Sequence, residues 1–235
     1  MDSKAAIHTE YGKKLTVDTI QLPDPRPDQV IVKLHSSGIC HSQLHQMHKP
    51  ESPTPSLLGH EGTGTVIAKG SEVNHLEEGD LAIVTWVNRD PVKGRPTYPS
   101  SGATYNEAPL NGATYTWGEH VLVRSGYVVK IPKTSDKYNS SIVGCAVLTG
   151  AGAVLHTAKV RPQDSVAIFG VGGVGLSALI MARILEAFPI IAVDISDEKL
   201  EFAKKFGATH LINSLKEDPI EAIHEITSGG SDFSF

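Results

Sequence analysis

Residues that can bind a metal are concentrated in the stretch GICHSQLHQMHKP, residues 38 to 50. The stretch holds Cys40, one of two cysteines in the chain, and three histidines, His41, His45 and His48. Thiolate sulfur and imidazole nitrogen are ligands that zinc favours. Two arrangements are open at this point. The segment forms a local site on one helical turn, or it contributes one ligand to a site completed by distant residues.

A second group of residues with chemical meaning is a glycine-rich turn. The stretch SVAIFGVGGVGLSALIMARILEA contains G-x-G-x-x-G at Gly170, Gly172 and Gly175, between an apolar strand pattern and a long helical pattern. In a dinucleotide-binding βαβ unit these glycines permit the tight turn, the approach of a pyrophosphate and close helix–strand packing. Gly173 and Val174 belong to the same phosphate-binding turn, because N–H groups at a helix N-terminus attract phosphate. An ordinary structural turn is the alternative.

An acid at the end of the next strand pattern indicates which dinucleotide the turn binds. Asp194 ends the stretch IIAVD. Its carboxylate would accept hydrogen bonds from ribose hydroxyls, whereas a 2′-phosphate would meet like charge. We therefore expect NAD rather than NADP. Lys199 is a candidate for a ribose contact, with a plain lysine on the helix surface as the alternative.

Two hydrophobic patterns must position these groups. The first 145 residues contain short runs rich in Val and Ile, such as QVIVKLHSSG, GTGTVIAKG and DLAIVTW, which predict the strands of a barrel or sandwich. Within them, residues 87 to 117 are rich in Pro, Gly, Ser and Asn, and we interpret them as a surface lobe. From about Leu148, strand and helix patterns alternate, which predicts a parallel sheet with right-handed crossovers.

The composition excludes several classes of protein. The net charge of −5 gives no electrostatic reason to expect nucleic acid or an anionic membrane surface as a partner. The longest apolar segment is interrupted by Arg183, Glu186 and Pro189, so no membrane span is expected. Two cysteines form no disulfide framework, and a reducing cytoplasm is the expected location.

Several motifs together resemble one family. GICHSQLH, GHEGTGTV, GCAVLTGAG, AIFGVGGVGLS and IIAVD occur in the order typical of the zinc-dependent alcohol dehydrogenases of the medium-chain dehydrogenase/reductase superfamily, and the resemblance covers essentially the whole chain. It implies an α+β with α/β fold. A GroES-like β-barrel catalytic domain, residues 1–146, precedes a Rossmann-type parallel-sheet domain, residues 147–235, that binds NAD and is incomplete at its C-terminus.

The resemblance implies a metal site assembled from distant residues. One catalytic zinc would be bound by Cys40, His60 and Cys145, with a fourth position open for substrate. Glu61 matches an acid close to the metal. The opening segment would then supply a single ligand, and the local Cys/His site remains the competing interpretation.

The remaining matches imply how the reaction runs. Ser42 and His45 match a proton relay, and His41 matches a position near the coenzyme pyrophosphate. Thr149 matches a neighbour of the nicotinamide, and Trp86 a wall of the substrate pocket, with a core tryptophan as the alternative. The implied reaction is the NAD-linked interconversion of a small-molecule alcohol and its aldehyde or ketone, by formation of a zinc alkoxide and hydride transfer.

Two positions depart from the family pattern. Gln43 stands where the family commonly has an aspartate that supports the metal-bound histidine, and a neutral amide adds less basicity to that ligand. Residues 87–117 contain no cysteine, so a structural zinc of the four-cysteine type is excluded.

The predicted sheet is shorter than a complete doubly wound fold. Strand patterns at SVAIF, IIAVD and HLINS are followed by the start of a fourth at SDFSF, whereas the fold has six strands. We therefore expect an N-terminal portion with poor activity on its own, from a full-length form that is a homo-oligomer. Two alternatives are kept: a zinc-free quinone or enone reductase of the same superfamily, and a non-catalytic nucleotide-binding fragment.

Overall fold

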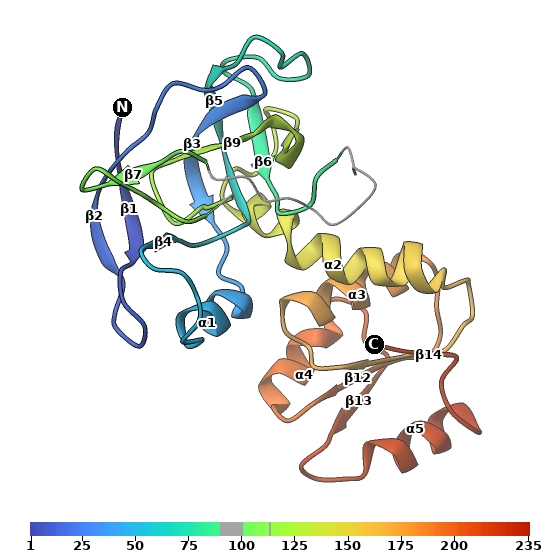
Figure 1. Ribbon diagram of the computed structural model, residues 1–235. Helices are drawn as coiled ribbons and strands as arrows, with labels where there is room; N and C mark the ends of the chain where they lie inside the picture. Colours follow the sequence, from blue (N-terminus) through green and yellow to red (C-terminus); the bar gives the residue numbers. More distant parts are fainter. Residues whose placement is uncertain (90–100, 113) are drawn as a thin grey trace. The chain divides into compact units, whose positions relative to one another are not determined.

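The chain forms two compact units. The computed structural model describes residues 1–89, 101–112 and 114–235, and these divide into Met1–Cys145 and Ala146–Phe235 (Figure 1). Each unit has a hydrophobic core of its own. Among the residues described, no helix is both long and apolar enough to cross a membrane.

The first unit is built from two five-stranded sheets whose strands pair antiparallel. Their orders are β4-β1-β2-β7-β8 and β10-β6-β5-β3-β9. Both sheets contribute to one core, for example Ile7 and Ile20 from the first and Val32 and Val66 from the second, which confirms the predicted barrel or sandwich. The strands are β1 (Asp2–His8), β2 (Thr16–Gln21), β3 (Gln29–Ser37), β4 (Ser56–Leu57), β5 (Gly62–Lys69), β6 (Leu81–Val84), β7 (Thr104–Tyr105), β8 (Ala108–Pro109), β9 (His120–Arg124) and β10 (Val128–Lys130).

Short helices complete this unit. The α-helix α1 (His41–Met47) follows β3, and two 3-10 helices, Ser125–Tyr127 and Asn139–Gly144, flank the end of the second sheet. Cys40 is the N-cap of α1, and its backbone N–H donates to Gln43 Oε1 at 3.0 Å. A side chain three positions into the helix thus satisfies an N–H at its start.

The surface-lobe interpretation is wrong for the second half of residues 87–117. Ala103, Leu110 and Tyr115 are at most 2% exposed and belong to the core. β7 joins the first sheet through the pairing of Gln21 with Thr104, which carries its neighbours inward. Residues 90–100 and 113, also assigned to the lobe, lie outside the described residues.

The second unit is the predicted parallel sheet with helices on both faces. Its strand order is β13-β12-β11-β14. Side chains of α3 and α4 pack against alternate residues of the strands, and Ile223 of α5 packs against the residues between them. Successive side chains of a strand point to opposite faces of a sheet, so the helices cover both faces. The elements are α2 (Ala146–Gly152), a π-helical turn (Ala153–Ala158), β11 (Val166–Phe169), α3 (Gly173–Ile184), β12 (Ile190–Asp194), α4 (Asp197–Lys204), β13 (His210–Asn213), α5 (Pro219–Thr227) and β14 (Phe233–Ser234).

Candidate metal centre and dinucleotide turn

Strand register brings the first two candidate ligands together. β3 and β5 pair antiparallel, and Ser37 at the end of β3 lies opposite Gly62 at the start of β5. Cys40 comes shortly after the end of β3, and His60 shortly before the start of β5. Both residues therefore lie at one end of the same strand pair.

The third candidate ligand reaches the same place from far along the chain. Cys145 directly follows the 3-10 helix Asn139–Gly144. Thr85, just beyond β6, donates from Oγ1 to the Gly144 carbonyl at 2.6 Å. A Cβ on Gly144 would lie 2.5 Å from the Val84 carbonyl oxygen, so only glycine permits this close approach. The helix end, and Cys145 with it, is thereby held against β6.

The three donor atoms form one group. One atom each from Cys40, His60 and Cys145 lies within 4.8 Å of the others. His60 Nε2 is 3.2 Å from Cys145 Sγ, and the two sulfurs are 4.0 Å apart. Two sulfurs that share a tetrahedral zinc are about 3.8 Å apart, because each Zn–S bond is about 2.3 Å. Burial lowers the pKa of His60 and so favours the neutral imidazole that binds metal. The donor set therefore fits zinc.

A cavity of about 720 Å³ opens beside this group. Ser42 and Trp86 line it together with the three donors. Trp86 is 40% exposed, so the alternative of a core tryptophan is wrong. The other lining residues are Gln43, Gln46, Pro53, Leu57, Leu58, Gly59, Asn111, Gly112 and Thr114.

Three further candidate site residues do not line this cavity. His41 and His45 are exposed on α1, and their rings meet edge to face with centroids 5.0 Å apart. Glu61 is only 3% exposed, and a Cβ on Gly38 would lie 2.5 Å from its carboxyl carbon. The acid is thus packed tightly against the backbone that leads from β3 to Cys40.

In the second unit, the glycine turn joins β11 to α3 as predicted. Gly170 has a φ of +88°, a left-handed conformation that glycine adopts without strain. Gly175 is buried, and a Cβ there would lie 1.9 Å from the Gly170 carbonyl oxygen. Gly172, Gly173 and Val174 are exposed at the start of α3. The first N–H groups of a helix have no partner within it, so this end can receive an anion.

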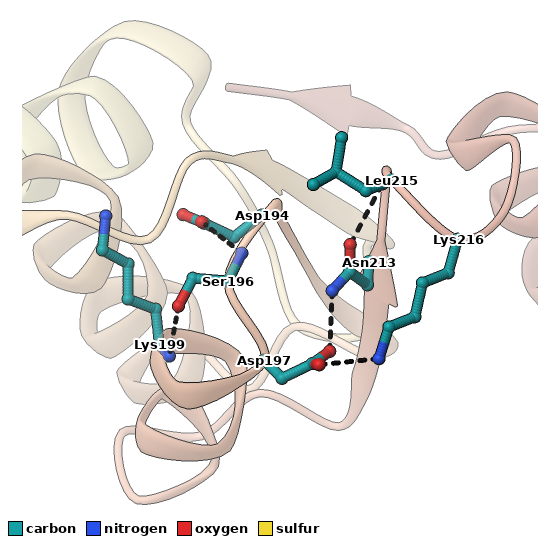
Figure 2. A network of polar contacts seen from close by, with 7 residues as sticks. All are labelled: Asp194, Ser196, Asp197, Lys199, Asn213, Leu215 and Lys216. Carbon is teal, nitrogen blue, oxygen red and sulfur yellow. Dashed lines mark hydrogen bonds and ion pairs between the residues drawn. The ribbon is translucent and has the colours of Figure 1, made fainter.

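Asp194 ties the end of β12 to the glycine turn. Its Oδ2 accepts from the Val171 N–H and its Oδ1 from the Ser196 N–H, each at 3.0 Å. Burial opposes ionisation, but these N–H donors and nearby Lys199 outweigh it, and the pKa of Asp194 lies below its ordinary value. Figure 2 shows the carboxylate above the start of α4.

A second set of contacts holds the neighbouring loops. Asp197 accepts from Asn213 Nδ2 at 2.7 Å and from Lys216 Nζ at 2.6 Å (Figure 2). Asp194, Gly170 and Lys199 line a cavity of about 340 Å³ with Phe169, Val193, Ile195 and Ser214. The end of β12 therefore presents a charged, buried acid beside a cavity.

Thr149 lies on α2 and is exposed. The next residue, Gly150, is buried, and a Cβ there would lie 2.1 Å from the Val174 carbonyl oxygen of α3. Gly150 was not predicted to have a role, although a glycine within a helical pattern is a signal of close packing. Nor were Leu57, Leu58 or Asn111, which line the metal cavity but belong to no motif.

Replacing Asp194 by asparagine is expected to lower the free energy of unfolding by about 1–3 kcal/mol at pH 7, because an amide leaves one buried N–H without an acceptor. A depressed carboxyl pKa stabilises the fold above the unfolded value of about 3.9 and loses that effect as pH falls through the folded value. The difference should therefore shrink towards pH 3. Urea titrations at both pH values measure it. Exposed Asp197→Asn is the control, and its cost should be clearly smaller, because contacts of an exposed carboxylate are screened by water. Equal losses for the two variants would contradict the prediction.

Comparison with known proteins finds one family match within each unit. Residues 26–133 match the model of the alcohol dehydrogenase GroES-like domain, and residues 173–235 match that of the zinc-binding dehydrogenases. The S-(hydroxymethyl)glutathione dehydrogenase of Synechocystis is 35% identical over 261 aligned positions, which cover 100% of this chain and 71% of the relative.

Solved structures agree with the sequence comparison. The alcohol dehydrogenase zinc-binding domain protein of Burkholderia ambifaria superposes with a TM-score of 0.93 at 32% identity. Benzyl alcohol dehydrogenase of Acinetobacter calcoaceticus gives 0.90 at 34% identity. The matches cover 100% of this chain and 70% of each structure. The chain is therefore an oxidoreductase with the fold of the zinc-binding dehydrogenases. The chain belongs to the zinc-dependent alcohol dehydrogenases of the medium-chain dehydrogenase/reductase superfamily.

Proposed function

We propose that the chain binds one catalytic zinc through Cys40, His60 and Cys145 and uses NAD to oxidise a small, uncharged alcohol or to reduce the matching aldehyde. The observation that carries this proposal is the convergence of the chain's two cysteines and a histidine, within 4.8 Å of one another, beside a cavity. A zinc-free reductase has no need of such a donor set. Cys40 and Cys145 form no disulfide in the described structure, and we propose a cytoplasmic location, where thiols stay reduced.

The zinc, when bound, polarises the alcohol oxygen as a Lewis acid. Ser42 lines the same cavity, and its Oγ accepts from Gln43 Nε2 at 3.3 Å. We assign Ser42 Oγ to receive the alcohol proton while its own hydroxyl proton passes on towards His45. His45 lies one turn further along α1 and is exposed, so its ring can pass a proton to water. His41 and Thr149 are proposed as coenzyme contacts, and Glu61 as an acid that supports the metal region.

We assign the binding of the dinucleotide coenzyme to the second unit. The start of α3 would receive the pyrophosphate, and Asp194 would accept hydrogen bonds from the ribose hydroxyls. Because its pKa is lowered, Asp194 is ionised at neutral pH and would repel a 2′-phosphate. NAD is therefore proposed as the coenzyme, with Lys199 as a further ribose contact.

The cavity wall suggests the substrate class. Pro53, Leu57, Leu58 and Trp86 give it apolar surface. Among the described lining residues there is no lysine or arginine that could pair with an anionic substrate. An apolar alcohol such as benzyl alcohol, the substrate in the name of one relative, therefore fits better than a glutathione conjugate with its carboxylates.

We expect alcohol-dependent reduction of NAD that needs zinc, with benzyl alcohol preferred to S-(hydroxymethyl)glutathione and NAD bound at least about tenfold more tightly than NADP. NADH formation by the zinc-loaded chain, and titration with each coenzyme, measure these quantities. NAD binding without any zinc uptake would instead support the zinc-free reductase or the non-catalytic fragment.

A further inference from the structure

Gln43 contacts both Cys40 and His60, and it is only 1% exposed. Its Oε1 accepts from the Cys40 backbone N–H at 3.0 Å. Its Nε2 lies 2.7 Å from His60 Nδ1 and donates to Ser42 Oγ at 3.3 Å. One buried amide therefore connects the backbone of one candidate ligand to the ring of another.

This arrangement determines which ring nitrogen of His60 carries the proton. An amide NH₂ facing Nδ1 makes Nδ1 the acceptor, so the proton of the neutral ring lies on Nε2. Nε2 then donates towards Cys145 Sγ, 3.2 Å away. A metal bound at Nε2 needs the lone pair of that nitrogen, so the proton must move to Nδ1. Nδ1–H would then face the amide NH₂, donor against donor.

Rotating the amide does not remove the conflict. With Oε1 turned towards His60 Nδ1–H, the NH₂ end would face the Cys40 N–H, which is again donor against donor. The conflict exists because Cys40 N–H and a metal-bound His60 both need an acceptor at this side chain, and an amide has one acceptor end. A carboxylate of the same length offers two.

We propose that Gln43 is a positioning residue that weakens zinc binding, by stabilising the His60 tautomer that cannot bind the metal. This inference rests on the proposed zinc site. It concerns affinity for zinc, and so it differs from the question of whether zinc binds at all.

The test compares Gln43→Glu with the wild-type chain, because the two side chains have the same shape and differ in the acceptor count. Zinc affinity is measured by competition with a chelator. We expect Gln43→Glu to bind zinc about 10–100-fold more tightly, the range found for residues that support metal ligands. Gln21→Glu is the control for the added charge. It adds the same charge at an exposed position at the end of β2, outside the lining of the metal cavity, and should change affinity less than about fivefold.

A second measurement is independent of zinc. In the zinc-free wild-type chain, nitrogen–proton NMR correlations of the His60 ring should place the proton on Nε2, and in Gln43→Glu on Nδ1. Equal zinc affinities of the wild type and Gln43→Glu would overturn the inference while leaving the zinc site intact. So would an equal gain from Gln21→Glu, or a wild-type proton already on Nδ1. No zinc uptake by any variant would overturn the inference and the proposed function together.

Discussion

Cys145→Ala is expected to abolish the retention of zinc by the chain. The wild type, dialysed against a mild chelator, should keep about one zinc per chain, as a site with three protein ligands does. Complete zinc sites contribute about 10–16 kcal/mol, so one ligand of several contributes roughly 4 kcal/mol, or about a thousandfold in affinity. Elemental analysis of the dialysed protein measures the stoichiometry directly.

His45→Ala is the matched control for this experiment. In the competing interpretation, Cys40 and the histidines of α1 form a local site, and His45→Ala would release the metal whereas Cys145→Ala would not. The two cysteine sulfurs lie 4.0 Å apart, and His45 is exposed beside His41. We therefore expect full zinc in His45→Ala. The reverse pattern would contradict the site assembled from distant residues.

The fold could be predicted because its signals are local. Runs of Val and Ile with turn residues between them gave the strands of the first unit, and the strand–glycine–helix pattern gave β11 and α3. The core role of Ala103, Leu110 and Tyr115 was missed, because they lie in a stretch whose composition is typical of a surface. What buries them is the distant pairing of β7 with β2, which no local pattern records.

The candidate site was predicted in part for a related reason. Cys40, His60 and Cys145 were expected together because the resemblance to the family implies it, but their meeting depends on the Ser37–Gly62 register and on Gly144 packing against β6. The residues that line the metal cavity could not be predicted from motifs. Leu57 and Asn111 line it only because separate loops meet there, and neither belongs to a motif.

Substitutions of two glycines in the nucleotide turn should distinguish a glycine needed for the fold from one needed for NAD binding. Gly175→Ala is expected to destabilise the chain by about 3 kcal/mol, at the upper end for an overpacked core, because the new Cβ would lie 1.9 Å from the Gly170 carbonyl oxygen. Gly172→Ala should change stability by less than about 1 kcal/mol, since no atom lies within 4 Å of its Cβ position and its φ is −79°.

NAD affinity should follow a different pattern. We expect Gly172→Ala to bind NAD about 10–100-fold more weakly than the wild type, because its methyl group would occupy the space through which the backbone approaches the pyrophosphate. Titration calorimetry with NAD and urea titration of both variants measure the two effects separately.

Gly175→Ala cannot decide the role of the turn by itself, because an ordinary structural turn would be destabilised equally. Gly172→Ala is the informative variant, because its Cβ would contact nothing in the fold, so weaker NAD binding at unchanged stability would indicate a ligand in that space. Unchanged NAD affinity in that variant would mean that the dinucleotide does not bind at this turn.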